Sequence, residues 1–286
     1  MLDKVEYQGV AGCFELSNGT VKIIVASEFG PRILSYSLGD RPNVLGWHPE
    51  AKVETSLGTW YPRGGHRLWI APENNPVSYA PDNDPVEVVE SSDLALTVRG
   101  GVDAAGNTKQ MTITLADSGS EVTIDHTLTV GSAREAAAWS LTIMAPGGTI
   151  IIPNEPFAPY SPEHLLPVRA MALWSYTDFT DPRWEFTKDA TRLRVDPSLP
   201  NQQKLGVLNR QGWAAYEWQG VRFEKRVDFA DDATYPDYNS NFEFYTAGDF
   251  VEIETLSPMK SAALGSMIEH REVWSMTLEQ NSSDGV

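Results

Sequence analysis

Short runs of alternating apolar and polar residues, separated by turn residues, recur along almost the entire chain, and a sustained helical period is not seen. Alternation with a period of two is typical of β-strands that are buried on one face. Five pairs of runs flank short turns and predict β-hairpins: 13–17 with 20–26, 86–90 with 94–99, 110–116 with 121–130, 213–218 with 221–229, and 241–246 with 250–256. The first pair is joined by Asn18-Gly19, which tolerates the positive φ angles of a type I′ turn.

Further runs predict strands outside these hairpins: 33–38, 139–144, 149–152, 168–174, 191–195, 205–208 and 273–278. So many strands exceed what one flat sheet holds, and large sheets split or pack face to face. The sequence contains no internal repeat and no clear domain boundary. We therefore expect residues 1–286 to form a single all-β domain of two large antiparallel sheets.

The charge of the chain restricts its partners. It has 39 acidic and 22 basic side chains, which give a formal net charge of −17. This charge repels phosphate backbones and anionic lipids, and no stretch approaches the ~20 apolar residues that span a bilayer. We expect a neutral ligand, and neither nucleic acid nor a membrane as partner. The single cysteine, Cys13, and an N-terminus without a signal-peptide pattern favour a cytoplasmic protein.

Nine tryptophans are many for a chain of this length. A sugar ring has apolar C–H faces that pack on an indole ring, while polar side chains bind its hydroxyl groups. Most tryptophans are expected in the core, where aromatic side chains are common. Trp60, Trp69 and Trp184 are the candidates for sugar contacts, because they lie beside Gly, Pro, His, Arg and Asp rather than inside apolar runs.

The stretch from Trp60 to Glu73 is the most unusual in the chain, because Gly64 and Gly65 precede His66 and Arg67. Paired glycines allow a close backbone approach, and the strand that follows carries the two polar side chains. These side chains are candidate ligand contacts. The alternative is a structural bulge whose histidine is hydrogen-bonded internally. His126 alternates with apolar residues, which favours a core histidine with satisfied hydrogen bonds.

The C-terminal hairpin is the candidate source of a catalytic base. Strand alternation places Glu243 with Tyr245 on one face, and likewise Glu252 with Glu254. A two-residue turn at 247–248 pairs Glu243 with Glu252, and one at 248–249 pairs Glu243 with Glu254. Either register brings two carboxylates together, which raises the pKa of one of them and suits acid–base chemistry. The alternative is a solvated outer face.

Several segments resemble galactose mutarotase-like proteins. They are Phe29-Gly30-Pro31-Arg32-Ile33-Leu34 after the first hairpin, Gly-Gly-His-Arg-Leu-Trp at 64–69, Trp-Ser-Leu-Thr at 139–142 leading to Pro153, and Glu-Ile-Glu-Thr-Leu-Ser-Pro at 252–258. The resemblance spans roughly residues 12 to 280. The segments that carry it are similar to those of an uncharacterised branch of that superfamily. It implies a supersandwich of two sheets that binds a hexose on the concave face of one sheet.

Aldose 1-epimerases of this superfamily interconvert anomers with a histidine acid and a glutamate base. Anomer exchange requires a proton for the ring oxygen and removal of one from the anomeric hydroxyl group. The resemblance implies an isomerase in which Glu254 is the base and His66 the acid. The residues expected to bind the sugar are Arg32, Arg67, Trp60, Trp69, Trp184, Glu243 and Glu252.

Two other functions fit the same residues. One is sugar binding without catalysis, because the histidine pattern of the epimerases is not found around any histidine of this chain. The other is a glycoside hydrolase or lyase that uses Glu243 with Glu252 or Glu254. No cofactor or metal is expected: Asp82-Asn83-Asp84 offers oxygen ligands, but Pro81 and Pro85 flank it and favour a turn. The sequence leaves the oligomeric state open.

Overall fold

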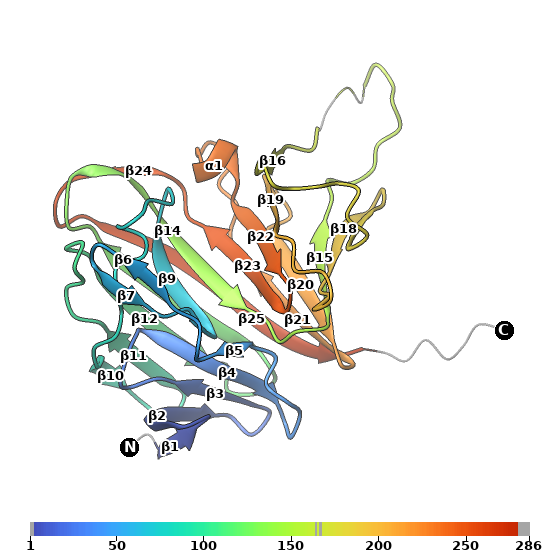
Figure 1. Cartoon of the computed structure of the whole chain (residues 1–286). Helices are drawn as coiled ribbons and strands as arrows, with labels where there is room; N and C mark the ends of the chain where they lie inside the picture. The colour runs from blue at the N-terminus through green and yellow to red at the C-terminus, as the bar shows by residue number, and fades with distance from the viewer. Residues whose placement is uncertain (1–2, 164, 166–167, 280–286) are drawn as a thin grey trace.

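Two large antiparallel sheets pack face to face in the computed structural model, which describes residues 3–163, 165 and 168–279 (Figure 1). The first sheet contains 11 strands. In spatial order they are β1 (Asp3–Tyr7), β2 (Val10–Ser17), β3 (Val21–Val25), β4 (Arg32–Leu38), β9 (His66–Ala71), β14 (Arg134–Ile143), β23 (Phe250–Leu256), β22 (Phe242–Ala247), β19 (Gln203–Val207) and β16 (Met171–Leu173), with β24 (Lys260–Ala262) paired to β14.

The second sheet contains 10 strands. Their order is β10 (Glu87–Ser91), β11 (Ala95–Arg99), β12 (Thr108–Leu115), β13 (Val122–Thr129), β25 (Met267–Leu278), β21 (Val221–Arg226), β20 (Trp213–Trp218), β15 (Thr149–Pro153), β18 (Ala190–Arg194) and β17 (Trp184–Phe186). Two small sheets pair β5 (Trp47–His48) with β8 (Arg63–Gly64) and β6 (Val53–Thr55) with β7 (Gly58–Trp60). Among the described residues the helical element is α1 (Pro236–Asn239), and no helix there is long and apolar enough to cross a membrane.

The predicted all-β architecture and the five predicted hairpins are confirmed. One detail of the first turn differs from the prediction. Gly19 has a φ of 83°, but Asn18 is not left-handed, so the turn is not type I′. Instead the Asn18 side-chain oxygen accepts hydrogen bonds from the backbone N–H groups of Thr20 and Val21, because an asparagine side chain can itself close a turn.

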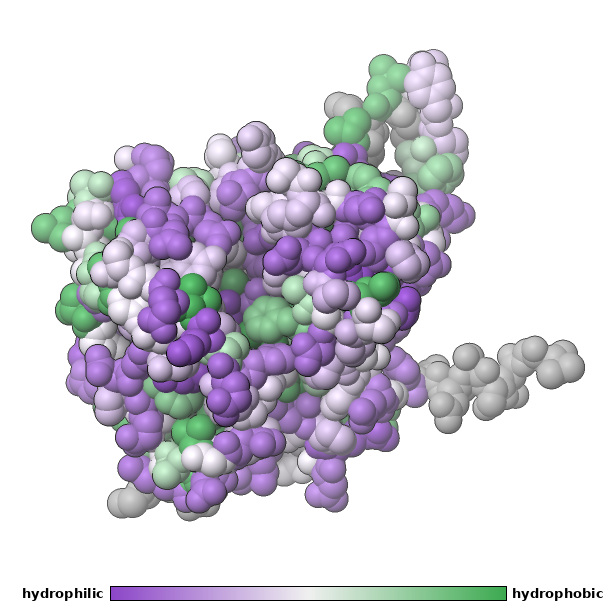
Figure 2. Space-filling view, viewed as in Figure 1, coloured by the Kyte–Doolittle hydropathy of each residue, from purple (hydrophilic) through white to green (hydrophobic). Residues whose placement is uncertain are grey.

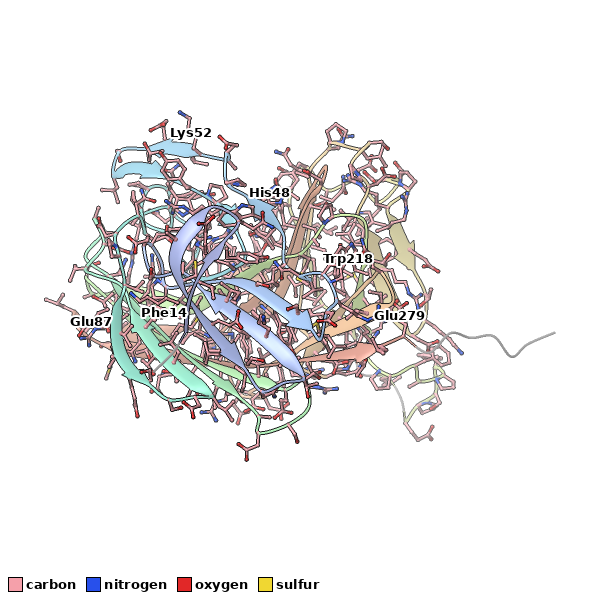
Figure 3. All side chains as sticks on the ribbon, turned by 90° about the horizontal axis from the view of Figure 1, so that it is seen from below. Phe14, His48, Lys52, Glu87, Trp218 and Glu279 are labelled. Carbon is pink, nitrogen blue, oxygen red and sulfur yellow. The ribbon has the colours of Figure 1, made fainter. Side chains whose placement is uncertain are left out.

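The main apolar core lies between the two large sheets. Ile253 and Phe244 of the first sheet and Phe223 and Trp274 of the second belong to it and are buried. Their neighbours in sequence therefore point away from the core, to the outer face of each sheet. In the view from below, the β6–β7 hairpin beside Lys52 projects from the body at one edge (Figure 3).

Candidate functional site

The outer face of the first sheet collects the polar and aromatic residues of its central strands. Across β9, β14 and β23, Arg67 pairs with Leu141 and Leu141 with Glu254, while Trp69 pairs with Trp139. Directly opposed residues in a sheet share a face, so these side chains lie together although they are far apart in sequence. Glu252, two residues from Glu254, has the same orientation.

A cavity of about 490 Å³ lies over this face. The space-filling view is hollowed near its centre, in front of β14 and β23 (Figure 2). Tryptophan and tyrosine rings, carboxylates and two cations form the wall, a composition typical of small-molecule sites. The lining residues are Val53, Trp60, Pro62, Arg67, Trp69, Glu73, Tyr79, Trp139, Leu141, Tyr176, Gln202, Lys204, Tyr245, Phe250, Glu252 and Glu254.

Glu254 lies at the floor of the cavity and is held on one side only. Its Oε2 atom accepts hydrogen bonds from Trp139 Nε1 (2.8 Å) and from Lys204 Nζ (3.2 Å). Oε1 receives no hydrogen bond from the described residues. Burial by itself lowers the pKa of Lys204, but the carboxylates of Glu254 and Glu243 raise it well above its ordinary value. Lys204 is therefore a permanent cation at the floor of the cavity.

Glu252 and Arg67 form the second charged pair of the cavity. Arg67 Nη2 donates to Glu252 Oε1 at 2.9 Å, and its guanidinium group lies 5.1 Å from the Trp60 ring centre and 4.7 Å from that of Trp69. Burial raises the pKa of Glu252, although Arg67 opposes the rise. The Nε and Nη1 atoms of Arg67 are buried and have no hydrogen-bond partner in the described part of the chain. These N–H groups are suited to an oxygen of a bound ligand, since an unpaired buried donor is costly.

Glu243 lies on the same face of the sheet as Glu254 but does not line the cavity. The turn falls at residues 248–249 and pairs Glu243 with Glu254, which is one of the two predicted registers. Glu243 is buried, and its Oε2 atom is 2.7 Å from Lys204 Nζ. The two carboxylates therefore share one cation. Only Glu254 of this pair lines the cavity.

Arg32 and Trp184 are not brought to the cavity. Arg32 donates hydrogen bonds to the backbone oxygens of Pro62 and Gly64 and to the Asp82 carboxylate at 2.7 Å, so it fastens the segment that carries Arg67. Trp184 belongs to β17, at the edge of the second sheet, and its indole N–H donates to Gln203.

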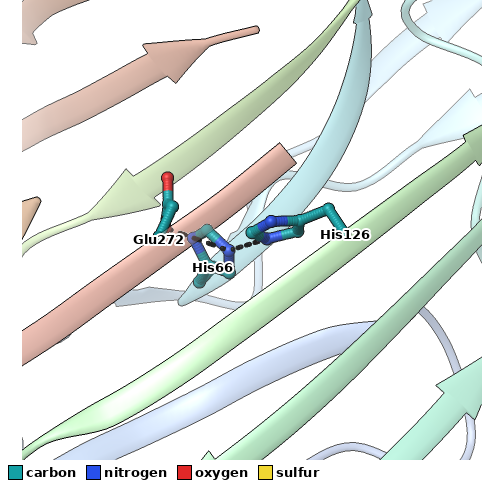
Figure 4. Close-up of side chains that lie close together, drawn as sticks. All are labelled: His66, His126 and Glu272. Carbon is teal, nitrogen blue, oxygen red and sulfur yellow. Dashed lines mark hydrogen bonds and ion pairs between the residues drawn. The ribbon is translucent and has the colours of Figure 1, made fainter. Parts of the chain in front are cut away.

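His66 faces the opposite side of its sheet from Arg67, because successive residues of a strand point in opposite directions. A 2.7 Å hydrogen bond joins its Nε2 atom to Nε2 of His126 (Figure 4). Its Nδ1 atom is 2.8 Å from the Thr142 hydroxyl. The structure thus buries His66 between the sheets and outside the cavity. Gly64 and Gly65 do mark a close approach, because a Cβ atom on either would collide with the backbone of Gly46 or Ile33.

Glu272 is the centre of a buried polar network between the sheets. Its carboxylate accepts hydrogen bonds from Ser140, Thr255 and Trp274, and lies 2.9 Å from Lys225 Nζ. His66, His126 and Glu272 are close enough to hold a metal ion. The 2.7 Å contact of the two rings is, however, an N–H···N hydrogen bond, and Lys225 already compensates the charge of Glu272. Internal hydrogen bonding accounts for this cluster.

The buried histidines predict that the protein loses stability as the pH falls below neutrality. Burial lowers the pKa of His66, His126 and His270, in the last case from 6.5 to about 3. The histidines of the unfolded chain therefore take up protons at a higher pH than those of the folded protein. The contribution of the neutral histidines to stability is complete above pH 6.5 and declines as the pH falls from 6.5 towards 3. Urea unfolding midpoints should decrease between about pH 7 and about pH 5.

A variant isolates this effect. His270→Gln keeps a group that can hydrogen-bond to Thr255 but removes one titrating ring, so its midpoint should change less with pH than that of the wild type. A wild-type midpoint that stays constant over this range would mean that the histidines bind protons equally in both states.

Several cavity residues were not predicted. Trp139 was not among the three tryptophans named as candidates for sugar contacts, and Lys204 precedes a predicted strand at 205–208. The observed strand β19 includes Lys204, and its pairing with Tyr245 places both side chains on the cavity face. Tyr176 lies in a loop that is fastened to β19 by the Thr177 hydroxyl group. No local sequence signal marks Lys204, because its place in the cavity depends on the pairing of β19 with β22.

Comparison with solved structures identifies the fold. A galactose mutarotase-like protein from Lactobacillus casei superposes with a TM-score of 0.56 at 11% identity and covers 93% of this chain and 100% of its own. A galactose mutarotase related enzyme from Lactobacillus acidophilus gives 0.56 at 8% identity, covering 94% and 98%. A candidate aldose 1-epimerase from Escherichia coli K12 gives 0.51 at 14% identity, covering 93% and 99%.

These similarities extend over nearly the whole chain and concern the fold. A comparison of the sequence with protein-family models and with curated proteins finds no match. The protein is a two-sheet β-sandwich with a polar and aromatic cavity on one sheet. It has the galactose mutarotase-like fold, and the resemblance noted in its sequence is confirmed at that level.

Proposed function

We propose that the cavity binds a neutral carbohydrate and that the protein interconverts its anomers. The observation that carries this proposal is the cavity itself, in which Trp60, Trp69 and Trp139 lie beside carboxylates and Arg67. Indole rings pack on the C–H faces of a sugar, while carboxylates accept and Arg67 donates hydrogen bonds to its hydroxyl groups. The solved structures with this fold include one described as a galactose mutarotase related enzyme and one described as a candidate aldose 1-epimerase.

The charges of the cavity favour a neutral ligand over an acidic one. Glu73, Glu252 and Glu254 line it, against the cations of Arg67 and Lys204. Both cations already form ion pairs with carboxylates of the protein. An added anion would meet repulsion that these pairs do not offset, whereas hydroxyl groups suit the free carboxylate oxygens.

The two carboxyl groups of β23 that line the cavity are the proposed base and acid for anomer exchange. In the proposed step, Glu254 takes the proton of the anomeric hydroxyl group and Glu252 gives a proton to the ring oxygen. The bond between the anomeric carbon and the ring oxygen breaks, which yields the open-chain aldehyde, and reclosure on its other face produces the second anomer. Glu252 is the proposed acid because burial raises its pKa despite the nearby Arg67, so a larger fraction of it is protonated at a given pH than of an ordinary glutamate.

This assignment replaces His66 as the acid, since His66 lies on the other face of β9, hydrogen-bonded to His126 and Thr142. It also disfavours a hydrolase that uses Glu243 with Glu254, because only Glu254 of that pair lines the cavity. Binding without catalysis is the second candidate. Binding without catalysis is supported by the absence of a histidine from the cavity wall among the described residues.

One experiment separates the two candidates. Pure α-anomers of neutral aldoses are mixed with the protein, and their equilibration is followed by real-time NMR. Catalysis predicts faster exchange for at least one aldose, in proportion to protein concentration. Saturable binding in calorimetry without faster exchange would leave a sugar-binding protein, and the absence of both would contradict the proposal.

A further inference from the structure

The cavity is broader than a single sugar ring. Its wall includes residues of β9, β14, β23, β22 and β19, which are adjacent strands of the first sheet. Four strand spacings of about 4.8 Å separate β9 from β19, so the floor is roughly 19 Å wide. The volume of about 490 Å³ lies within the range that encloses drug-sized ligands, which are larger than a monosaccharide.

Aromatic rings gather at both ends of this floor. At the β9 end, the Trp60 ring centre lies 4.9 Å from that of Trp69 and 5.5 Å from that of Tyr79. At the other end Tyr176 and Tyr245 line the cavity, and Tyr245 contacts Phe250 with ring centres 6.2 Å apart.

The carboxylates lie between these two ends. Glu252 and Glu254 are on β23, which separates β14 from β22. The backbones of Trp69 and Tyr245 are three strand spacings apart, roughly 14 Å, so one pyranose ring cannot pack against both ends. A ring bound over the carboxylates therefore leaves at least one aromatic end for another ring.

We infer that the ligand is a neutral oligosaccharide of at least two linked rings, with one ring over Glu252 and Glu254 and a second against an aromatic end. This inference rests on the proposed sugar-binding function and specifies the size of the ligand. The outer ring gains apolar contact with tyrosine and tryptophan faces and makes no contact with the reacting atoms.

The test compares affinities in a series of matched sugars. Calorimetry with the whole protein should give dissociation constants for glucose, maltose and cellobiose, and for galactose and lactose. We expect at least one disaccharide to bind about fivefold or more tightly than its own monosaccharide, because a second ring adds an aromatic contact. Equal affinity of every disaccharide and its monosaccharide would overturn the inference while leaving sugar binding intact. No binding of any sugar would instead overturn the proposed function.

Two variants locate the second ring. Tyr79→Ala and Tyr176→Ala change opposite ends, and one of them should lower the affinity for the disaccharide much more than the affinity for its monosaccharide. Tyr238→Ala is the matched control, since Tyr238 is 96% exposed and is not part of the cavity wall. If the gain persists in both variants, whose folding is checked by thermal unfolding, the aromatic ends do not bind the second ring and the inference fails.

Discussion

Replacing Glu254 by glutamine is expected to slow anomer exchange by about 100- to 10,000-fold, the range that a positioned base contributes. Glutamine retains the shape of the side chain and can still accept hydrogen bonds from Trp139 and Lys204, but it cannot take the proton of the anomeric hydroxyl group. Sugar affinity should therefore change much less than the rate. The measurement is the NMR exchange rate at saturating sugar, with affinity from calorimetry.

Two further variants make this prediction specific. Glu269→Gln makes the same chemical change at an exposed position of β25 and should leave the rate unchanged. Glu252→Gln removes the proposed acid. In the wild type, deprotonation of this acid, whose pKa is raised, should lower the exchange rate at high pH. The residual rate of the variant should lack this decline. If Glu254→Gln retains the wild-type rate, Glu254 is not the base.

The fold could be predicted because the alternation of the strands is local information. Hairpins such as β12–β13 have apolar residues at every second position and turn residues between them, and the burial patterns of both strands follow this period. Short strands that are defined mainly by pairing with a neighbouring strand were not predicted. β6 and β7 are three residues each, and β24 is defined by its pairing with β14.

The candidate site could be predicted only in part, because a cavity depends on which strands become neighbours. The site residues named from patterns within single segments include five that line the cavity: Trp60, Arg67, Trp69, Glu252 and Glu254. Lys204 lines it because β19 pairs with β22, and that pairing is not visible in local sequence.

His66 illustrates a second reason why the candidate site could be predicted only in part. The Gly-Gly-His-Arg segment drew attention to two adjacent residues, but adjacent residues of a strand cannot share a face. Arg67 therefore reaches the cavity, and His66 reaches the core. The partners of His66 come from β13 and β14, and the strand order that brings them together follows from tertiary packing.

Replacing Lys225 by methionine is expected to lower the free energy of unfolding by about 3–5 kcal/mol, because it leaves the Glu272 carboxylate buried without its cation. Both side chains are fully buried and 2.9 Å apart. Although burial raises the pKa of Glu272, Lys225 and the nearby histidines lower it well below its ordinary value. Urea unfolding at neutral pH measures the loss. Arg99→Met, in the exposed pair with Glu87, is the matched control and should cost no more than about 1 kcal/mol.

The pH dependence of this loss distinguishes an unpaired charge from a packing defect. A folded pKa below the unfolded value adds stability above the unfolded pKa, and this stability is lost as the pH falls through the folded pKa. Without Lys225 the folded pKa of Glu272 rises, so its protonation relieves the cost and the difference from the wild type should shrink in mild acid. A difference that stays constant with pH would indicate lost packing. Because Ser140 and Thr255 bind Glu272 and adjoin Trp139 and Glu254, the same variant should also weaken sugar binding if the network holds the cavity floor in place.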